Sequence, residues 1–180
     1  LAVTVPLSAL ALYAFLGSPG TPDQPHAASA GRVDKVLSAL EEANLRLAVE
    51  TNRKKLLANP NDISAWLGLA KALQGQGRSA DAVDALSKAL IVSNGDPNIR
   101  GIYGEALMLA ANGIVTKESR EAFTGVLAER PSDPRARYFL SLGDWQDGKH
   151  HEALTAWSKL AAEAKAEDGW VGLVRERITL

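Results

Sequence analysis

The 180-residue sequence contains no cysteine, which excludes disulfide frameworks, thiolate metal sites and cysteine nucleophiles. It has only three histidines, and the adjacent His150 and His151 diverge on a helix, so they cannot form the i, i+4 pair of a metal site. No glycine-rich loop follows a strand-like segment, as a phosphate-binding loop requires. The formal net charge is −1, so no bulk field attracts nucleic acid or anionic lipid. These absences argue against an enzyme, and we expect no cofactor, no metal and no nucleic-acid partner.

Aromatic residues are few as well, at 6 %, whereas alanine and leucine are abundant, and this composition favours an all-α fold. The length allows one ordinary domain with additional segments. We expect four parts in chain order: the end of a transmembrane helix (residues 1–16), a Pro/Gly-rich linker (17–31), a long amphipathic helix (32–58), and a helical-repeat domain with a C-terminal capping helix (59–180).

The clearest pattern in the chain is the segment WLGLAKALQGQGRSADAVDALSKA, residues 66–89. Apolar side chains at i, i+3 and i+7 predict the buried stripe of a first helix, formed by Trp66, Leu69 and Leu73. Gly77 is placed to end that helix and reverse the chain into a second one. The small residues Ala70 and Ala82 allow the two helices to approach closely. One such unit cannot bury its own apolar face, so we expect neighbouring units.

Two further units follow the first. Aligned on the first-helix positions, the second contains Arg100, Tyr103, Gly104, Leu107, Phe123 and Pro131, and the third contains Arg137, Leu140, Ser141, Asp144, Gly148, Ala153 and Trp157. The step from Trp66 to Arg100 is 34 residues and the step from Arg100 to Arg137 is 37, with the extra residues in the loop around 112–116. The units match the tetratricopeptide (TPR) pattern W-x2-L-G-x2-Y, A-x3-F and P, with a period of about 34 residues. The alternative is a generic helical bundle with chance alanine and leucine periodicity.

Residues 1–16, LAVTVPLSALALYAFL, contain no charged side chain, and the first charge is that of Asp23. Roughly 20 apolar residues span a bilayer as a helix, and the chain begins without methionine, so we interpret this stretch as the end of a membrane span. Tyr13 would then lie at the membrane interface. A secretory signal peptide cleaved near residues 28–30 and a buried core helix are the alternatives.

The segment GSPGTPDQP, residues 17–25, combines three prolines with two glycines and predicts an extended or turning linker. A long helix is predicted next, with an apolar stripe formed by Val33, Val36, Leu37, Leu40 and Leu47. It should end by Asn59, because Pro60 disfavours helical geometry in the residue before it. We expect this helix to lead into the repeats, to pack against a partner helix, or both.

A last helix is predicted over residues 168–180, where one face carries Trp170, Leu173, Val174 and Ile178. Repeat stacks need a terminal helix to cover their open end, and this segment fits that role. Trp170 is therefore expected in the core.

Four segments carry a more specific resemblance than the repeat pattern alone. They are ALYAFLGSPGTPDQP, NPNDISAWLGLAKAL, TKESREAFTGVLAERPSDPRARYFLSLGDWQDGKHHEALTAWSKL and GWVGLVRERI, and the resemblance that they carry extends over almost the whole chain. In these segments and their order the chain resembles the CcmI or CycH family of cytochrome c biogenesis factors, which are TPR-containing apocytochrome c chaperones. The sequence departs from the usual repeat at Arg137 and Asp144, where bulky apolar residues are typical, so the packing of the third repeat is the open point.

The resemblance implies a protein of the bacterial inner membrane with its TPR domain in the periplasm, and residues 1–16 as the end of a second membrane span. It implies a chaperone that binds the C-terminal helix of apocytochrome c and passes the client to the subunits of the membrane haem-ligation complex. The chain has no Cys-x-x-Cys-His motif, so any covalent haem would belong to the client.

Stacked TPR units line a concave groove with the exposed positions of their first helices. In the first unit these positions are Ser64, Leu67, Lys71 and Gln74; in the second, Asn98, Gly101, Glu105 and Met108; in the third, Arg135, Tyr138, Leu142 and Trp145. Such a mixed groove suits an amphipathic helix. We expect Met108, Tyr138, Leu142 and Trp145 to anchor it, and Lys71, Glu105 and Arg135 to orient it. The alternatives are that Tyr138 and Trp145 only pack between helices, and that the chain is a TPR scaffold of a cell-envelope assembly rather than a chaperone.

Overall fold

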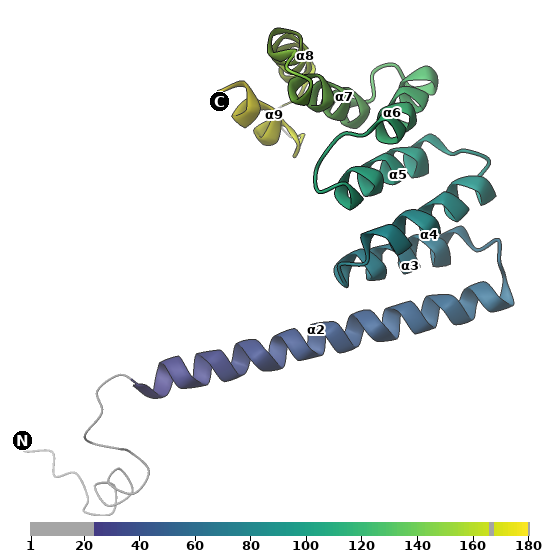
Figure 1. Ribbon diagram of the computed structural model, residues 1–180, viewed down its shortest axis with the longest axis vertical. Coiled ribbons are helices and arrows are strands. Elements are labelled where there is room, and N and C mark those ends of the chain that lie inside the picture. The colour runs from purple at the N-terminus through teal and green to yellow at the C-terminus, as the bar shows by residue number, and fades with distance from the viewer. Residues whose placement is uncertain (1–23, 166–167, 180) are drawn as a thin grey trace, which may run out of the picture. The chain divides into compact units, whose positions relative to one another are not determined.

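The computed structural model describes residues 24–165 and 168–179, and within these ranges the chain is helical, without strands. The described helices are α2 (Gln24–Ala58), α3 (Ile63–Gly75), α4 (Ser79–Val92), α5 (Pro97–Ala110), α6 (Lys117–Glu129), α7 (Pro134–Gln146), α8 (His150–Glu163) and α9 (Val171–Ile178). From α3 onward, each helix packs against the next one in the chain (Figure 1). The chain divides into two compact units, residues 1–43 and 44–180, and the second contains the repeats.

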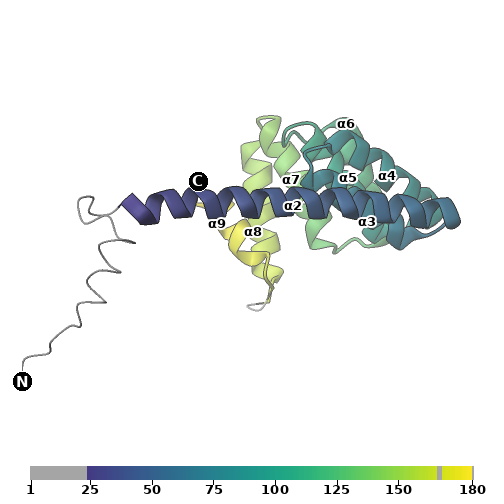
Figure 2. The same cartoon turned by 90° about the horizontal axis from the view of Figure 1, so that it is seen from below.

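Helix α2 is a single unbroken helix of 35 residues (Figure 2). It begins at Gln24, so residues 24–31, which the sequence assigned to the linker, are helical. Proline is tolerated in the first turn of a helix, where its missing N–H has no partner to lose, and Pro25 lies in that turn. The helix ends at Ala58, before Pro60, as predicted.

The second part of α2 belongs to the repeat unit. Val49 and Leu56 are buried in one core cluster with residues of α3 and α4. Two glycines of α3 lie directly against side chains of α2: Gly68 against Asn52 and Gly75 against Leu45. This part of the long helix therefore packs onto the first repeat. The apolar stripe Val33, Val36, Leu37, Leu40 and Leu47 is 55–66 % exposed.

Helices α3 to α8 form the three predicted helix pairs. The α3–α4 and α7–α8 turns each contain a glycine with positive φ, at Gly77 (72°) and Gly148 (81°). The α5–α6 connection is longer, as the insertion predicted, and places Asn112 and Gly113 in the same left-handed region. The all-α TPR architecture expected from the sequence is thus confirmed.

The core repeats a small–large pattern on the second helix of each pair. The small members are Ala82, Ser119 and Ala153, all 0 % exposed, and the large members are Leu86, Phe123 and Trp157, at 0–1 %. The small side chains let the paired helices approach, and the large ones fill the space between neighbouring pairs. The packing between the helices of the second pair is tight at Gly104, because a Cβ built on this residue would lie 2.9 Å from the Phe123 ring.

The third pair packs in spite of Arg137 and Asp144. The Arg137 guanidinium pairs with Glu163 at the end of α8, and Arg100 makes the equivalent pair with Glu129 at the end of α6. Asp144 lies 3.5 Å from both Arg120 of α6 and Lys149. Ion pairs between helices thus take the place of apolar contacts at these two positions.

Helix α9 packs against α8 and buries Val171 and Val174. The expected capping helix is therefore present, but Trp170 was predicted in the core and is only half-buried. Its indole packs on the Trp157 cluster and also borders a pocket. The side chain of Leu173 lies outside the described residues.

The predicted membrane span, residues 1–16, and the first part of the predicted linker, residues 17–23, also lie outside the described residues. Among the helices that the structure does describe, none combines the length and the hydropathy needed to cross a bilayer.

Candidate functional site

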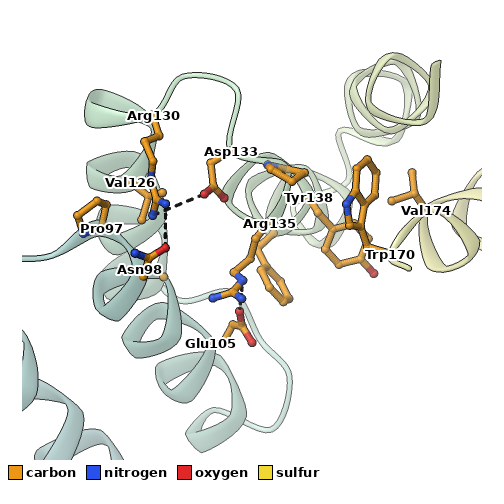
Figure 3. Close-up of a pocket in the computed structure, with 13 residues that line it drawn as sticks. Pro97, Asn98, Glu105, Val126, Arg130, Asp133, Arg135, Tyr138, Trp170 and Val174 are labelled. Atoms are coloured by element: carbon orange, nitrogen blue, oxygen red, sulfur yellow. Dashed lines mark hydrogen bonds and ion pairs between the residues drawn. The ribbon is translucent and has the colours of Figure 1, made fainter. Parts of the chain in front are cut away.

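The groove expected from the first helices contains a pocket of about 390 Å³ between α5, α7 and α9 (Figure 3). Helix α5 contributes Asn98, Gly101 and Glu105 to its wall. Helix α7 contributes Arg135, Tyr138 and Phe139, and Trp170 and Val174 come from the α9 side. The lining is completed by Val126 of α6, by Arg130 directly after that helix, and by Pro97, Asp133 and Pro134. The pocket therefore joins aromatic walls with four charged side chains.

Two helix starts place the polar side chains at this pocket. Asp96 caps α5 by accepting hydrogen bonds from the Asn98 N–H at 2.8 Å and the Ile99 N–H at 3.2 Å. These bonds hold the pKa of the Asp96 carboxyl below its usual value. Asp133 caps α7 in the same way, at 3.0 Å from the Ala136 nitrogen. A proline follows each cap, as is common at the first helical position, so both Asp-Pro pairs fix where the helices begin.

The charged groups are arranged in two sets across the pocket. Arg135 Nε lies 3.0 Å from Glu105 Oε1, which joins α7 to α5. Arg130 donates to Asn98 Oδ1 at 2.8 Å and lies 3.7 Å from the Asp133 carboxylate. The Arg130 Nε is buried without a hydrogen-bond partner.

Burial raises the pKa of Glu105 above its usual value, and the nearby Arg135 opposes this rise only in part. Its carboxylate is thus desolvated more than its ion pair compensates.

The structure brings together five of the twelve predicted groove positions at the pocket: Asn98, Gly101, Glu105, Arg135 and Tyr138. Leu142 and Trp145 do not; they pack with Tyr138 on the cluster around Trp157. The Trp145 and Tyr138 rings lie 5.8 and 5.9 Å from the Trp157 ring, and Trp145 also lies 4.3 Å from the ring of His150.

The remaining predicted residues also lie off the pocket wall. Lys71 is exposed on α3, Gln74 is half-buried on the same helix, and Met108 is half-buried on α5. They stay predictions for a longer contact surface along the groove.

Sequence reasoning missed several wall residues. Arg130, Asp133 and Phe139 are not at the first-helix positions used to predict the groove, and Trp170 was assigned to the core. The Asp-Pro pairs at 96–97 and 133–134 were a usable signal, because they mark the two helix starts that meet at the pocket. Among residues 24–165 and 168–179, no cluster of side chains fits a metal ion.

The fold and the groove define the class: the chain is a TPR protein. Its helices superpose on crystal structures of MamA with a TM-score of 0.58, at 23 % identity. In one of these, the match covers 74 % of this chain and 78 % of the other. At that identity the likeness shows the fold alone.

The sequence comparison is more specific. The family described as the TPR domain of cytochrome c-type biogenesis protein H matches residues 30–170, and the chain belongs to that family. It is 38 % identical over 174 residues to the cytochrome c-type biogenesis protein CycH of Rhizobium meliloti, and 37 % identical over 177 residues to the protein of that name from Bradyrhizobium diazoefficiens. These matches cover 97 % and 98 % of this chain but 44 % and 47 % of the relatives, so the chain spans less than half their length.

The resemblance found in the sequence is thereby confirmed at the level of the family. The relatives are named as biogenesis proteins, and neither their names nor the family description indicates an enzymatic activity.

Proposed function

We propose that this TPR domain acts as an apocytochrome c chaperone in c-type cytochrome maturation. It binds the C-terminal helix of the client in its groove and passes the client to the membrane haem-ligation complex. The domain works on the periplasmic side of the bacterial inner membrane, anchored by residues 1–16. The observation that carries this proposal is an aromatic pocket with charged side chains on the groove of a chain from the cytochrome c biogenesis family.

The pocket has the chemistry that an amphipathic helix needs. Tyr138, Phe139 and Trp170 offer large rings, and aromatic residues dominate the binding energy of many interfaces. The ion pairs at Glu105 and Arg135 can orient a docked helix through its polar face.

The rival function is a non-chaperone scaffold of a cell-envelope assembly. The exposed stripe of α2 favours it, because five large apolar side chains on one helix could dock a folded partner. A chaperone takes an isolated client peptide, whereas a scaffold needs a folded surface.

Binding of the full chain to a peptide with the sequence of an apocytochrome c C-terminal helix tests the proposal. We expect a dissociation constant of about 1 μM or tighter, and much weaker binding of an unrelated amphipathic helix of equal length. Equal binding of both peptides would leave the scaffold function.

Gly101 offers a way to block the pocket without removing a packed ring. Its added Cβ would lie 3.5 Å from Arg135 and 3.9 Å from Val126, which are ordinary contacts, so Gly101→Ala serves as the matched control. Gly101→Leu places a larger side chain in the pocket, and we expect it to weaken client-peptide binding at least tenfold with unchanged helicity by circular dichroism. Tyr138 and Trp145 are poorer targets, because their rings pack on Trp157 and alanine there would also loosen the core.

A further inference from the structure

The four charged side chains at the pocket are not equally accessible. The Asp133 side chain is 16 % exposed and its carboxylate is engaged by the Ala136 N–H. The Glu105 side chain is 35 % exposed, whereas those of Arg130 and Arg135 are 38 % and 48 % exposed. The charge that a ligand meets at this pocket is therefore positive, although the formal charges balance.

The ion pair with Glu105 uses only part of the hydrogen-bond donors of Arg135. A guanidinium carries five N–H groups in a planar fork, and Arg135 meets Glu105 through Nε. Its two terminal nitrogens can thus bind a carboxylate side-on.

Next to this cation lies an apolar space. Tyr138 and Trp170 both line the α9 side of the pocket that Arg135 borders, and Val174 adds an aliphatic wall there (Figure 3). A matching ligand presents a carboxylate and a bulky apolar side chain only a few bonds apart. The last residue of a peptide does so, and the C-terminal end of a helix adds the negative pole of its dipole.

We propose that this pocket binds the C-terminal residue of the client helix. Its α-carboxylate lies on Arg135, and its bulky apolar side chain lies against Tyr138 and Trp170. The inference rests on the proposed function and adds a requirement to it: the client must end at the pocket with a free carboxylate.

The test compares three versions of one apocytochrome c C-terminal helix peptide against the full chain by calorimetry. The first has a free C-terminal carboxylate, the second a C-terminal amide, and the third three added glycines. We expect the amide and the extended peptide to bind at least tenfold more weakly than the free acid. A fourth peptide, with glutamine in place of the acidic residue nearest its end, should bind like the first.

The protein side of the test removes the cation. Arg135→Met leaves Glu105 half-buried without its partner, so the double variant Arg135→Met/Glu105→Gln keeps the pocket neutral. We expect this double variant to bind the free acid and the amide with equal, reduced affinity. Arg53→Met, an exposed arginine of α2, is the matched control and should keep the preference for the free acid.

The outcomes separate this inference from the function on which it rests. If the acid, amide and extended peptides bind the unmodified chain equally tightly, the C-terminal site is wrong and the chaperone function stands. If the glutamine peptide alone loses affinity, the cation binds a side-chain carboxylate and the C-terminal site is again wrong. If no version binds, both proposals fail.

Discussion

The first and the third repeat share one backbone arrangement but are held together by different side chains. In the first, the buried residues of α3 and α4 are all alanines and leucines. In the third, Trp157 fills the core, and Arg137 and Asp144 make ion pairs where the repeat pattern has bulky apolar residues. The two repeats have in common the pattern of small and large buried positions, which different side chains thus fulfil.

The first position of the TPR pattern, held by Trp66 in the first repeat, shows this difference between the repeats. Trp66 lies half-buried on α3 and its indole N–H donates to the Pro60 carbonyl at 2.8 Å. Arg100 and Arg137 hold the same position in the other repeats and pair with Glu129 and Glu163 instead. An arginine can fill this place because its aliphatic stem packs on apolar surface while its charged end reaches a partner.

The largest effect should come from truncating the third-repeat core. Trp157→Ala removes a ring that contacts Tyr138 and Trp145, and we expect it to lower the free energy of unfolding by about 3–5 kcal/mol. Urea denaturation followed by circular dichroism measures this change. Ile114→Ala, at an exposed site, should change stability by less than about 0.5 kcal/mol. A loss below about 1 kcal/mol for Trp157→Ala would mean that the ion pairs, and not the ring, hold this repeat.

A smaller effect should appear where the second repeat differs from the first. Ala70 and Gly104 occupy one position of the pattern, but only Gly104 faces a phenylalanine ring. Despite the better helix propensity of alanine, we expect Gly104→Ala to cost about 1–3 kcal/mol by overpacking against Phe123.

The exchange Phe123→Leu tests the cause, because it gives the second repeat the leucine of the first. We expect Gly104→Ala to cost less in that background. Gly172→Ala on α9, where nothing lies within 4 Å of the added Cβ, should be neutral or slightly stabilising. Equal costs of Gly104→Ala with Phe123 and with Leu would rule out the ring contact as the reason.

The smallest effect concerns two carboxylates with opposite pKa shifts. Burial raises the pKa of Glu105 above 4.5, so the folded chain binds more protons there than the unfolded chain and loses stability as the pH rises through the raised pKa. The hydrogen bond from Arg137 lowers the pKa of Glu163, which therefore adds stability that is lost as the pH falls through the lowered pKa.

Thermal melts of glutamine variants at pH 4 and pH 7 check these signs. Between pH 4 and pH 7, the melting temperature of Glu105→Gln should rise relative to that of the unmodified chain by on the order of 1 °C. The melting temperature of Glu163→Gln should fall relative to it over the same range. A change of relative melting temperature with the same sign for both variants would contradict the opposite pKa shifts of Glu105 and Glu163.

The repeat register, the helix pairs and the turn at Gly77 followed from the sequence because each depends on spacing along a short stretch of chain. The start of α2 did not, since a proline in the first turn and a proline that breaks a helix look alike in sequence. Trp170 was placed in the core for a similar reason: its helical face is visible in the sequence, but the extent to which α8 covers it is not.

The candidate site divides in the same way. Glu105, Arg135 and Tyr138 were predicted from the repeat geometry, because first helices in a TPR stack present the same positions to the groove. The pocket itself depends on Trp170 and Val174, which the α9 side brings to α5 and α7. The pocket residues of α5 lie more than 60 positions earlier in the chain than these two side chains. Local periodicity can set which face of a helix is buried, but only the packing of distant helices fixes which side chains meet and how far each charge is removed from water.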